Sequence, residues 1–273
     1  MTVEIDIDDR LAKEAELLAA QSFMPLSDIA AKMGISESTV RRDLQVLEGQ
    51  GIARRTHGGA VFVRDGSVGA AGSEVAGLAE KQAIARAVAE LIPLGQTVML
   101  NGGTTCQQIA KSLVGRRLNI VTNSVSAAAL LCTDSTSEVT LIGGYVYPRI
   151  GVAVGAMAEH QLENMHAGRF ITSCAGLTED GPFEPNQMMA DLEQRMMHSA
   201  DETILAADHA KLGVRSVVRL CELAQIDVIV TDSAASPEAR AWLDRSGVRV
   251  IYAGEKSAEC RVSSVESKTQ GQS

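Results

Sequence analysis

Residues 36–60 read SESTVRRDLQVLEGQGIARRTHGGA, and the pattern of this stretch decides the fold of the amino-terminal part of the chain. Its first half predicts a helix capped by Ser36, because a serine side chain can accept a hydrogen bond from the first free backbone N–H groups of a helix. Val40, Leu44 and Leu47 recur at positions i, i+4 and i+7, so they share one buried face of this helix. The remaining side chains therefore face outward.

The outward face of this helix is polar and basic. At about 100° per residue, Ser38, Arg42 and Gln45 lie roughly opposite the apolar residues, and Arg41 lies on the flank. A face of this kind suits contact with a hydrogen-bonding and negatively charged partner.

Two further helices are expected on the amino-terminal side. RLAKEAELLAAQSF, residues 10–23, is rich in helix-forming residues, and DIAAKM, residues 28–33, follows with Ser27 as its cap and Gly34 as its end. The tripeptide GIS joins this short helix to the next one. Two helices joined by a tight turn, the second with a polar and basic outer face, are typical of a helix-turn-helix that reads the major groove of DNA.

A β-hairpin is predicted directly after the helix-turn-helix. Residues 52–56 and 60–63 have the character of two short strands, and the glycine pair between them is a turn signal. Such a hairpin forms a wing, in which Arg54, Arg55 and His57 place positive charge beside the DNA backbone. The alternative is a three-helix knob whose arginines only keep the protein in solution.

The chain carries a net charge of −9, which by itself argues against nucleic-acid binding. Residues 32–64 differ, because six basic residues against three acidic ones give this stretch a charge of +3. An acidic protein can still present one basic face to phosphate. Aromatic residues make up only 3% of the chain, too few for a platform that stacks single-stranded bases. Double-stranded DNA is therefore the predicted partner.

Composition predicts a folded protein of the cytoplasm. The hydrophobic fraction of 45% and the charged fraction of 22% exclude a mostly disordered chain. No run of about 18 apolar residues could span a membrane, and the start, MTVEIDIDDR, has no apolar block of a secretory signal. The five widely spaced cysteines form no CxxC pair, which fits a reducing compartment better than a disulfide framework or a zinc site.

Strands that alternate with helices predict a second, larger α/β domain after a Gly-, Ala- and Ser-rich linker at residues 65–79. This alternation implies βαβ units and a mainly parallel sheet. The expected strands are residues 97–100, 118–122, 139–143, 169–176, 203–207, 227–231 and 249–253. We expect the DNA-binding domain at residues 1–64, the α/β domain at residues 80–255 and a disordered tail at residues 256–273.

Small polar residues follow several of these strands, at the edge where open α/β sheets bind ligands. The first strand leads into Asn101, Gly102, Gly103, Thr104 and Thr105, whose glycines, hydroxyls and following helix N-terminus suit an anion. The other residues of the predicted effector pocket are Asn123, Ser124, Gly143, Gly144, Gly176, Asp208 and Lys211. They predict a site for a small phosphorylated or polyhydroxylated molecule. The alternative is a tight strand-to-helix connection, with Asp208 as a loop cap and Lys211 as a surface residue.

Patterns typical of enzymes are scarce. The histidines show no metal-binding spacing, and the chain has no GxSxG elbow, no GxxxxGKS/T and no GxGxxG after a strand. Glu184, Asp191 and Glu193 could reach a ligand, yet no carboxylate stands at the identified strand ends. We therefore expect no metal, no cofactor and no enzymatic activity.

Residues 36–60 closely resemble the signature of DeoR-type bacterial transcriptional regulators, in which a Thr, two arginines, an Asp and a Leu precede LE and R-x-HGGA. The later segments EKQAIA, NGGTT, VTNS, IGG and AADHAKLG resemble the effector domain of that family. The resemblance covers about residues 10–253. The chain departs from the family pattern at Asn101, in HAGRF and in the loop TEDGPFEPNQMM.

The resemblance implies a winged helix-turn-helix followed by a domain similar in fold to ribose-5-phosphate isomerase. The implied function is that of a transcriptional regulator, a repressor of a carbohydrate or polyol catabolic operon, whose operator binding changes when a phosphorylated sugar binds. By the match, Gly102, Gly103, Thr104 and Thr105 hold the phosphate, Asn123 and Ser124 line the sugar, and Lys211 is the pocket cation. The expected DNA-contacting residues are Ser36, Ser38, Thr39, Arg41, Arg42, Gln45, Arg54, Arg55 and His57.

A homo-oligomer, a dimer or a tetramer, is expected because one small module buries too little surface for operator affinity. Two other classes of function stay open at this point. One is an active sugar-phosphate isomerase or deaminase with an accessory domain, which would need a general base beside the substrate carbon. The other is a protein-interaction module without a DNA role, against which the basic stretch argues.

Overall fold

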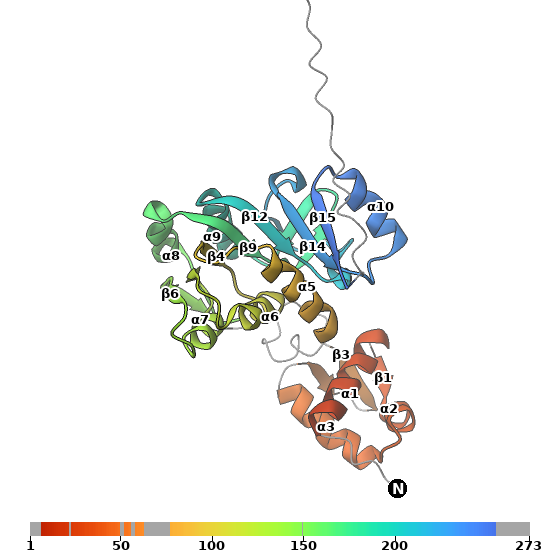
Figure 1. Ribbon diagram of the computed structural model, residues 1–273. Coiled ribbons are helices and arrows are strands. Elements are labelled where there is room, and N and C mark those ends of the chain that lie inside the picture. Colours follow the sequence, from red (N-terminus) through yellow and green to blue (C-terminus); the bar gives the residue numbers. More distant parts are fainter. Residues whose placement is uncertain are drawn as a thin grey trace, which may run out of the picture.

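The computed structural model describes residues 7–21, 23–49, 52–55, 58–62, 77–148 and 150–254 (Figure 1). His57, residues 65–76 of the predicted linker and the predicted tail lie outside the described residues. The predicted linker at residues 65–79 extends too far, because the helix α5 (Leu78–Glu90) already begins at Leu78. No helix among the described residues is long and apolar enough to cross a lipid bilayer.

The amino-terminal part contains three helices and a small antiparallel sheet. Its elements are α1 (Ile7–Gln21), β1 (Phe23–Pro25), α2 (Leu26–Met33), α3 (Glu37–Gly49), β2 (Ala53–Arg55) and β3 (Gly59–Phe62). The predicted hairpin is confirmed as β2 paired with β3. A third strand, β1, completes the sheet in the order β1-β3-β2, at the segment where the sequence predicts only a break between helices.

The ends of α2 and α3 test the predicted caps. Gly34 ends α2 as predicted, with a φ of 66° and an N–H that donates to the carbonyl of Ala30. Ser36 Oγ accepts from the backbone N–H of Thr39 at 3.2 Å, as expected of a cap. The predicted role of Ser27 is wrong, because α2 already begins at Leu26. Pro25 precedes it with a φ of −62° and fixes the backbone direction in place of a side-chain cap.

The buried face predicted for the third helix is confirmed. Val40, Leu44 and Leu47 of α3 are at most 1% exposed, and they pack against Leu18 of α1 and Ile29 of α2. A compact apolar core therefore fixes α3 against the two preceding helices.

The larger part alternates strands and helices. It begins with α5 (Leu78–Glu90), β4 (Thr97–Leu100), α6 (Thr104–Leu113), β5 (Asn119–Thr122), α7 (Val125–Leu131), β6 (Glu138–Leu141), β7 (Tyr145–Tyr147), β8 (Val152–Val154), α8 (Ala156–Gln161), η1 (Leu162–Asn164) and β9 (Ala167–Thr172). It continues with β10 (Gly176–Thr178), β11 (Gly181–Glu184), α9 (Gln187–His198), β12 (Ala200–Ala206), η2 (His209–Lys211), β13 (Val218–Arg219), η3 (Leu223–Gln225), β14 (Val228–Asp232), α10 (Pro237–Arg245) and β15 (Arg249–Ala253).

Seven of these strands form one parallel sheet in the order β15-β14-β12-β9-β4-β5-β6 (Figure 1). Every neighbouring pair in it is parallel. The seven predicted strands and the predicted sheet type are therefore confirmed. The predicted strand over residues 169–176 is shorter than expected, because β9 ends at Thr172 and Gly176 opens the separate strand β10.

Helices cover both faces of this sheet, because alternate residues of a strand point to opposite sides. Val98 and Leu100 of β4 pack with Ile84 of α5 and Ile109 of α6, whereas Met99 belongs to a separate cluster with Leu192 of α9. Because both faces of the sheet are buried, the sequences of its strands are short continuous apolar runs.

The strand order reverses between β4 and β9. The chain runs from β4 outward through β5 to β6, and then returns to the other side of β4 and runs outward again from β9 through β12 and β14 to β15. Such a reversal is where open parallel sheets bind ligands, at the carboxyl ends of the strands. Here those ends are Leu100 with Asn101, and Thr172 with Ser173.

Candidate functional site

The outer face of α3 is exposed as the sequence predicts. Ser38, Arg41, Arg42 and Gln45 are all exposed, while Thr39 is half-buried. This face belongs to a helix whose other side is fixed in the core, so the polar side chains stand on a rigid support. The geometry suits insertion into a groove of duplex DNA.

The exposed arginines differ in their partners. Arg41 donates to Glu37 at 3.0 Å, and Arg55 of β2 donates through Nε to Glu48 at 2.8 Å. Arg42 makes no ion pair with any residue that the structure describes. The guanidinium of Arg42 is therefore directly available to a phosphate or a base edge. The guanidinium groups of Arg41 and Arg55 first have to break their ion pairs with Glu37 and Glu48. Arg54 lies in β2, and His57 lies outside the described residues.

A charged cluster lies beneath α3. Asp43 of α3 is only 5% exposed and receives two hydrogen bonds from Arg10 of α1, at 2.6 and 2.9 Å. Glu14 of α1 is fully buried, and neither of its carboxyl oxygens has a hydrogen-bond partner. Burial and the nearby Asp43 raise the pKa of Glu14 to about 8. Glu14 therefore stays mostly protonated at neutral pH, because a second buried negative charge next to Asp43 is unfavourable.

In the larger part, side chains from distant segments meet where the strand order reverses. Asn101, which follows β4, donates through Nδ2 to Thr172 Oγ1 of β9 at 2.9 Å. Thr172 Oγ1 in turn donates to Glu193 Oε2 of α9 at 2.9 Å. All three residues are at most 4% exposed. This chain of hydrogen bonds brings a carboxyl group from α9 to the carboxyl ends of β4 and β9.

A second buried carboxyl group, Glu184 at the end of β11, lies in the same region. It is 3% exposed, and its Oε1 has no hydrogen-bond partner. Burial raises the pKa of Glu184 well above its usual range, Glu193 raises it further, and the positive charge of Lys211 opposes both effects. Burial likewise raises the pKa of Glu193 to about 8, against the hydrogen bonds from Thr172 and Asn101. The two glutamates thus form a buried pair that favours protonation.

The sequence named Glu184 and Glu193 among the acids that could reach a ligand, but it did not predict that they come to the strand ends. Glu184 and Glu193 come from β11 and α9, whose chain positions lie far from Asn101. One sequence signal could have identified Glu193, which falls in register with the buried Met189 and Met196 on the apolar face of α9. An acid on such a face needs a buried partner. Asp191, which the sequence grouped with these two acids, instead accepts a hydrogen bond from Gln187 in an exposed position.

The predicted anion loop also lies at this edge. No side-chain oxygen caps the N-terminus of α6 at Gly103, and a Cβ at Gly103 would lie 3.1 Å from Ser173 Oγ after β9. Thr104 and Thr105 are the first residues of α6. A Cβ at Gly102 would come within 2.1 Å of the side chain of Val152, so only glycine fits there. The loop therefore packs tightly against its neighbours and leaves a helix N-terminus near the reversal point.

Asn123 and Ser124 follow β5 at the same sheet edge. Ser124 Oγ accepts from the backbone N–H of Ala127 at 3.3 Å and caps α7. Asn123 is 1% exposed and donates through Nδ2 to the carbonyl of Ala153 at 3.3 Å, while its Oδ1 has no partner. Asn123 therefore contributes a second buried acceptor oxygen without a donor.

Two acids position Lys211. Asp208 accepts from the backbone N–H of Ala210 at 3.1 Å and caps the short turn η2, and Asp232 accepts from the backbone N–H of His209 at 2.7 Å. Lys211, half-buried at the end of η2, lies close enough to Glu184 to act on its charge. The charge of Lys211 therefore opposes the effect of burial on the pKa of Glu184.

The remaining predicted glycines have packing roles. The N–H and carbonyl of Gly143 bond the side-chain amide of Gln161. A Cβ at Gly144 would lie 2.9 Å from the carbonyl oxygen of Val154, and one at Gly176 would lie 2.2 Å from that of Val214. These contacts explain why glycine is required at both positions.

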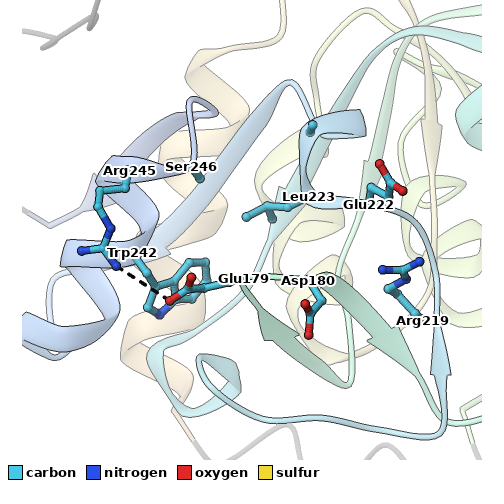
Figure 2. Close-up of a pocket in the computed structure, with 9 residues that line it drawn as sticks. Glu179, Asp180, Arg219, Glu222, Leu223, Trp242, Arg245 and Ser246 are labelled. Carbon is cyan, nitrogen blue, oxygen red and sulfur yellow. Dashed lines mark ion pairs between the residues drawn. The ribbon is translucent and has the colours of Figure 1, made fainter.

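A separate pocket of about 510 Å³ lies between the β10–β11 turn and α10 (Figure 2). Its lining residues are Glu179, Asp180, Arg219, Glu222, Leu223, Ala224, Trp242, Arg245 and Ser246, none of which belongs to the predicted effector site. Arg245 pairs with Glu179 at 3.8 Å (Figure 2), and Asp180 pairs with Arg215. The lining of this pocket holds no orphaned buried polar atom among the described residues.

Both parts of the chain match known protein families. The profile of the DeoR-like helix-turn-helix domain matches residues 10–65, and that of the DeoR C terminal sensor domain matches residues 77–233. The transcriptional regulator YulB of Bacillus subtilis is 30% identical over 247 residues, which cover 89% of this chain and 96% of that protein. The transcriptional repressor CsqR of Escherichia coli is 32% identical over 248 residues, with coverages of 86% and 91%.

Among solved structures, ribose 5 phosphate isomerase A from Neisseria gonorrhoeae aligns with 50% of this chain and 53% of its own, at a TM-score of 0.37 and 15% identity. This likeness is too distant to add to the fold assignment, which rests on the sheet itself. Family profiles over both parts and relatives along nearly the full length agree with the helix-turn-helix and the parallel sheet described above. The chain therefore belongs to the DeoR family of transcriptional regulators, with the helix-turn-helix domain of that family near its amino terminus and the sensor domain in its α/β part.

Proposed function

We propose that the chain binds operator DNA through α3 and the β2–β3 wing, and that a phosphorylated sugar or polyol at the carboxyl edge of the parallel sheet changes this binding. The observation that carries the first half is the exposed polar face of α3, where Arg42 is free of ion pairs with described residues. The second half is supported by the uncapped N-terminus of α6 and by Lys211 near the reversal point, since a phosphate needs N–H donors and a cation. The names of relatives such as CsqR favour repression.

Replacing Arg42 tests the DNA-binding half. Arg42→Ala should weaken operator binding by about 5- to 150-fold, which corresponds to about 1–3 kcal/mol for one base or phosphate contact. Fluorescence anisotropy with DNA from upstream of the gene measures the affinity. Arg249→Ala is the matched control, because Arg249 is an exposed arginine of β15 in the other domain. Equal affinities of Arg42→Ala and wild type would contradict the assignment of α3 as the recognition helix.

Operator binding in the presence of ligands tests the sensor half. A ligand that couples the two sites by about 1–3 kcal/mol shifts operator affinity by about 5- to 150-fold. A panel of phosphorylated sugars and polyols, added to the anisotropy assay, should contain at least one member with such an effect. A panel that leaves DNA binding unchanged, while the DNA still binds, would remove the sensor half and keep the DNA-binding half.

The remaining features of the proposal follow from these two. We infer a cytoplasmic dimer or tetramer that acts on two operator half-sites and performs no catalysis on its ligand, with the domain limits at residues 1–64 and 80–255. Sedimentation of the free protein tests the oligomer. Binding to a duplex with one half-site scrambled tests the symmetry, because a dimer loses most of its affinity when one half-site is absent.

A further inference from the structure

One oxygen of the buried glutamate pair at the reversal point has no hydrogen-bond partner among the described residues. Glu184 Oε1 lacks a partner although Glu184 is only 3% exposed. Asn123 Oδ1, from the end of a different strand at the same edge, also lacks one at 1% exposure. A buried acceptor without a donor is costly and rare in folded proteins. A ligand that enters here therefore gains most if it brings N–H or O–H donors.

The charges around these acceptor oxygens indicate which kind of donor group a ligand should carry. Glu184, Glu193, Asp208 and Lys211 all act on the buried thiol of Cys174, and Glu193 also acts, together with the cation Arg219, on that of Cys221. Asp208 is already held by the N–H of Ala210. A sugar phosphate brings two further negative charges at neutral pH. Lys211 supplies one positive charge, so a bound phosphate disfavours ionisation of the glutamate pair unless the ligand also brings a positive charge of its own.

We propose that Glu184 and Glu193 form an acidic subsite for a positively charged amino group, so that the effector is a phosphorylated amino sugar rather than a neutral sugar phosphate. This inference rests on the proposed sensor function and specifies its ligand class. An ammonium group supplies both missing elements, N–H donors for Glu184 Oε1 and a charge opposite to that of the pair. Lys211 then remains available to the phosphate.

Binding of a charged amino group replaces the proton that the glutamate pair holds in the free protein. In the free protein the two buried carboxyl groups repel each other as anions and retain a proton at neutral pH. When the ammonium group binds, both carboxyl groups become carboxylates and the retained proton leaves to the buffer. A hydroxyl in the same place donates a hydrogen bond but brings no charge, so the pair keeps its proton.

Matched ligand pairs test the inference on the full-length protein. The probes are glucosamine 6-phosphate and galactosamine 6-phosphate, each compared with the corresponding hexose 6-phosphate. Isothermal titration calorimetry in two buffers of different ionisation enthalpy measures affinity and proton release together. We expect at least one amino compound to bind about tenfold more tightly than its hydroxyl counterpart, because a paired buried charge contributes more than a neutral hydrogen bond. That compound should release up to about one proton.

Variants of the pair provide an independent measurement. Glu193→Gln and Glu184→Gln remove one charge each at nearly constant volume, and they should abolish the preference for the amino compound and the proton release. Glu179→Gln is the matched control, because Glu179 is an exposed acid of the pocket in Figure 2, outside this site. Thermal unfolding of each variant reports whether the fold is intact. If a glutamine variant does not fold, the wild-type proton release still decides the question.

The possible failures are distinguishable. If hexose phosphates bind as tightly as the amino compounds, or if the amino compounds release no proton, the acidic subsite is refuted and the sensor function stands. If only a phosphorylated sugar without an amino group changes operator binding, the acidic subsite is likewise refuted and the sensor function stands. If no phosphorylated compound of either kind binds or changes operator binding, the subsite and the sensor function fail together.

Discussion

Glu14 is expected to make the helix-turn-helix domain lose stability as the pH rises. The carboxyl group of Glu14 is fully buried on α1, its oxygens have no partners, and its pKa is raised to about 8 by burial and by Asp43. Asp43 lies on α3 and is held by Arg10. Ionisation of Glu14 would place a second carboxylate close to Asp43 of α3, whose charge Arg10 already pairs.

The magnitude follows from the difference between the folded and the unfolded pKa. The unfolded chain releases the Glu14 proton near its ordinary pKa of 4.5 and the folded chain near 8, so the folded state binds more protons between these values. The free energy of unfolding therefore falls as the pH rises through this window, and it is constant above and below it. At about 1.4 kcal/mol per pKa unit, with allowance for solvent screening, roughly 1 kcal/mol is lost between about pH 7 and pH 9.

Hydrogen exchange of the full-length protein measures this loss segment by segment. The free energy of opening of α1 and α3, corrected for the intrinsic pH dependence of exchange, should fall by about 1 kcal/mol from about pH 7 to pH 9 in the wild type. Glu14→Gln should remove this slope, whereas Glu16→Gln, an exposed glutamate of the same helix, should keep it. A slope that persists in Glu14→Gln would refute the argument.

Three further results are expected. Leu44→Ala should lower the free energy of unfolding by about 2–5 kcal/mol, and Val46→Ala, on the exposed side of α3, by no more than about 0.5 kcal/mol, as chemical denaturation can show. Arg10→Ala leaves the buried Asp43 unpaired and should cost about 3–5 kcal/mol in the same assay; a loss below about 1 kcal/mol would mean that the pair contributes little. Operator affinity should fall linearly with salt on a double-logarithmic scale, and Arg42→Ala should reduce the slope by about 1 if the guanidinium contacts a phosphate; an unchanged slope would assign Arg42 to a base edge.

Local patterns predicted the fold well where side chains alternate or recur. Val40, Leu44 and Leu47 mark the buried face of α3, and the seven apolar runs coincide with the seven strands of the parallel sheet. Apart from the β2–β3 hairpin, which its glycine pair marks, the short antiparallel strands were not predicted, because segments such as β7 and β10 span three residues and carry no periodicity. The start of α2 was also predicted incorrectly. The fixed backbone angle of Pro25 lets α2 begin at Leu26, one residue before the serine that was expected to cap it.

The candidate site was predicted in part: residues that follow a strand were identified, whereas Glu184 and Glu193 were named only as acids that could reach a ligand. Asn101 and Lys211 were identified because they come directly after apolar runs. Glu184 and Glu193 meet Asn101 through the strand reversal, which places β9 next to β4 and thereby brings α9 and β11 to the same edge. Sequence patterns do not report which strands are neighbours. They also favour exposed positions for glutamates, which are rarely buried without a partner.

The ion pairs of Arg41 with Glu37 and of Arg55 with Glu48 have a consequence for the search among chromosomal sites. Each arginine carries a tethered counterion, so a DNA phosphate must compete with a carboxylate that stays close at hand. Random duplex offers only phosphates for this competition, whereas an operator adds base contacts. Under the proposed binding mode the loss of these ion pairs costs about the same on any duplex, so base contacts offset this cost at an operator and not at the many competing sites of a genome.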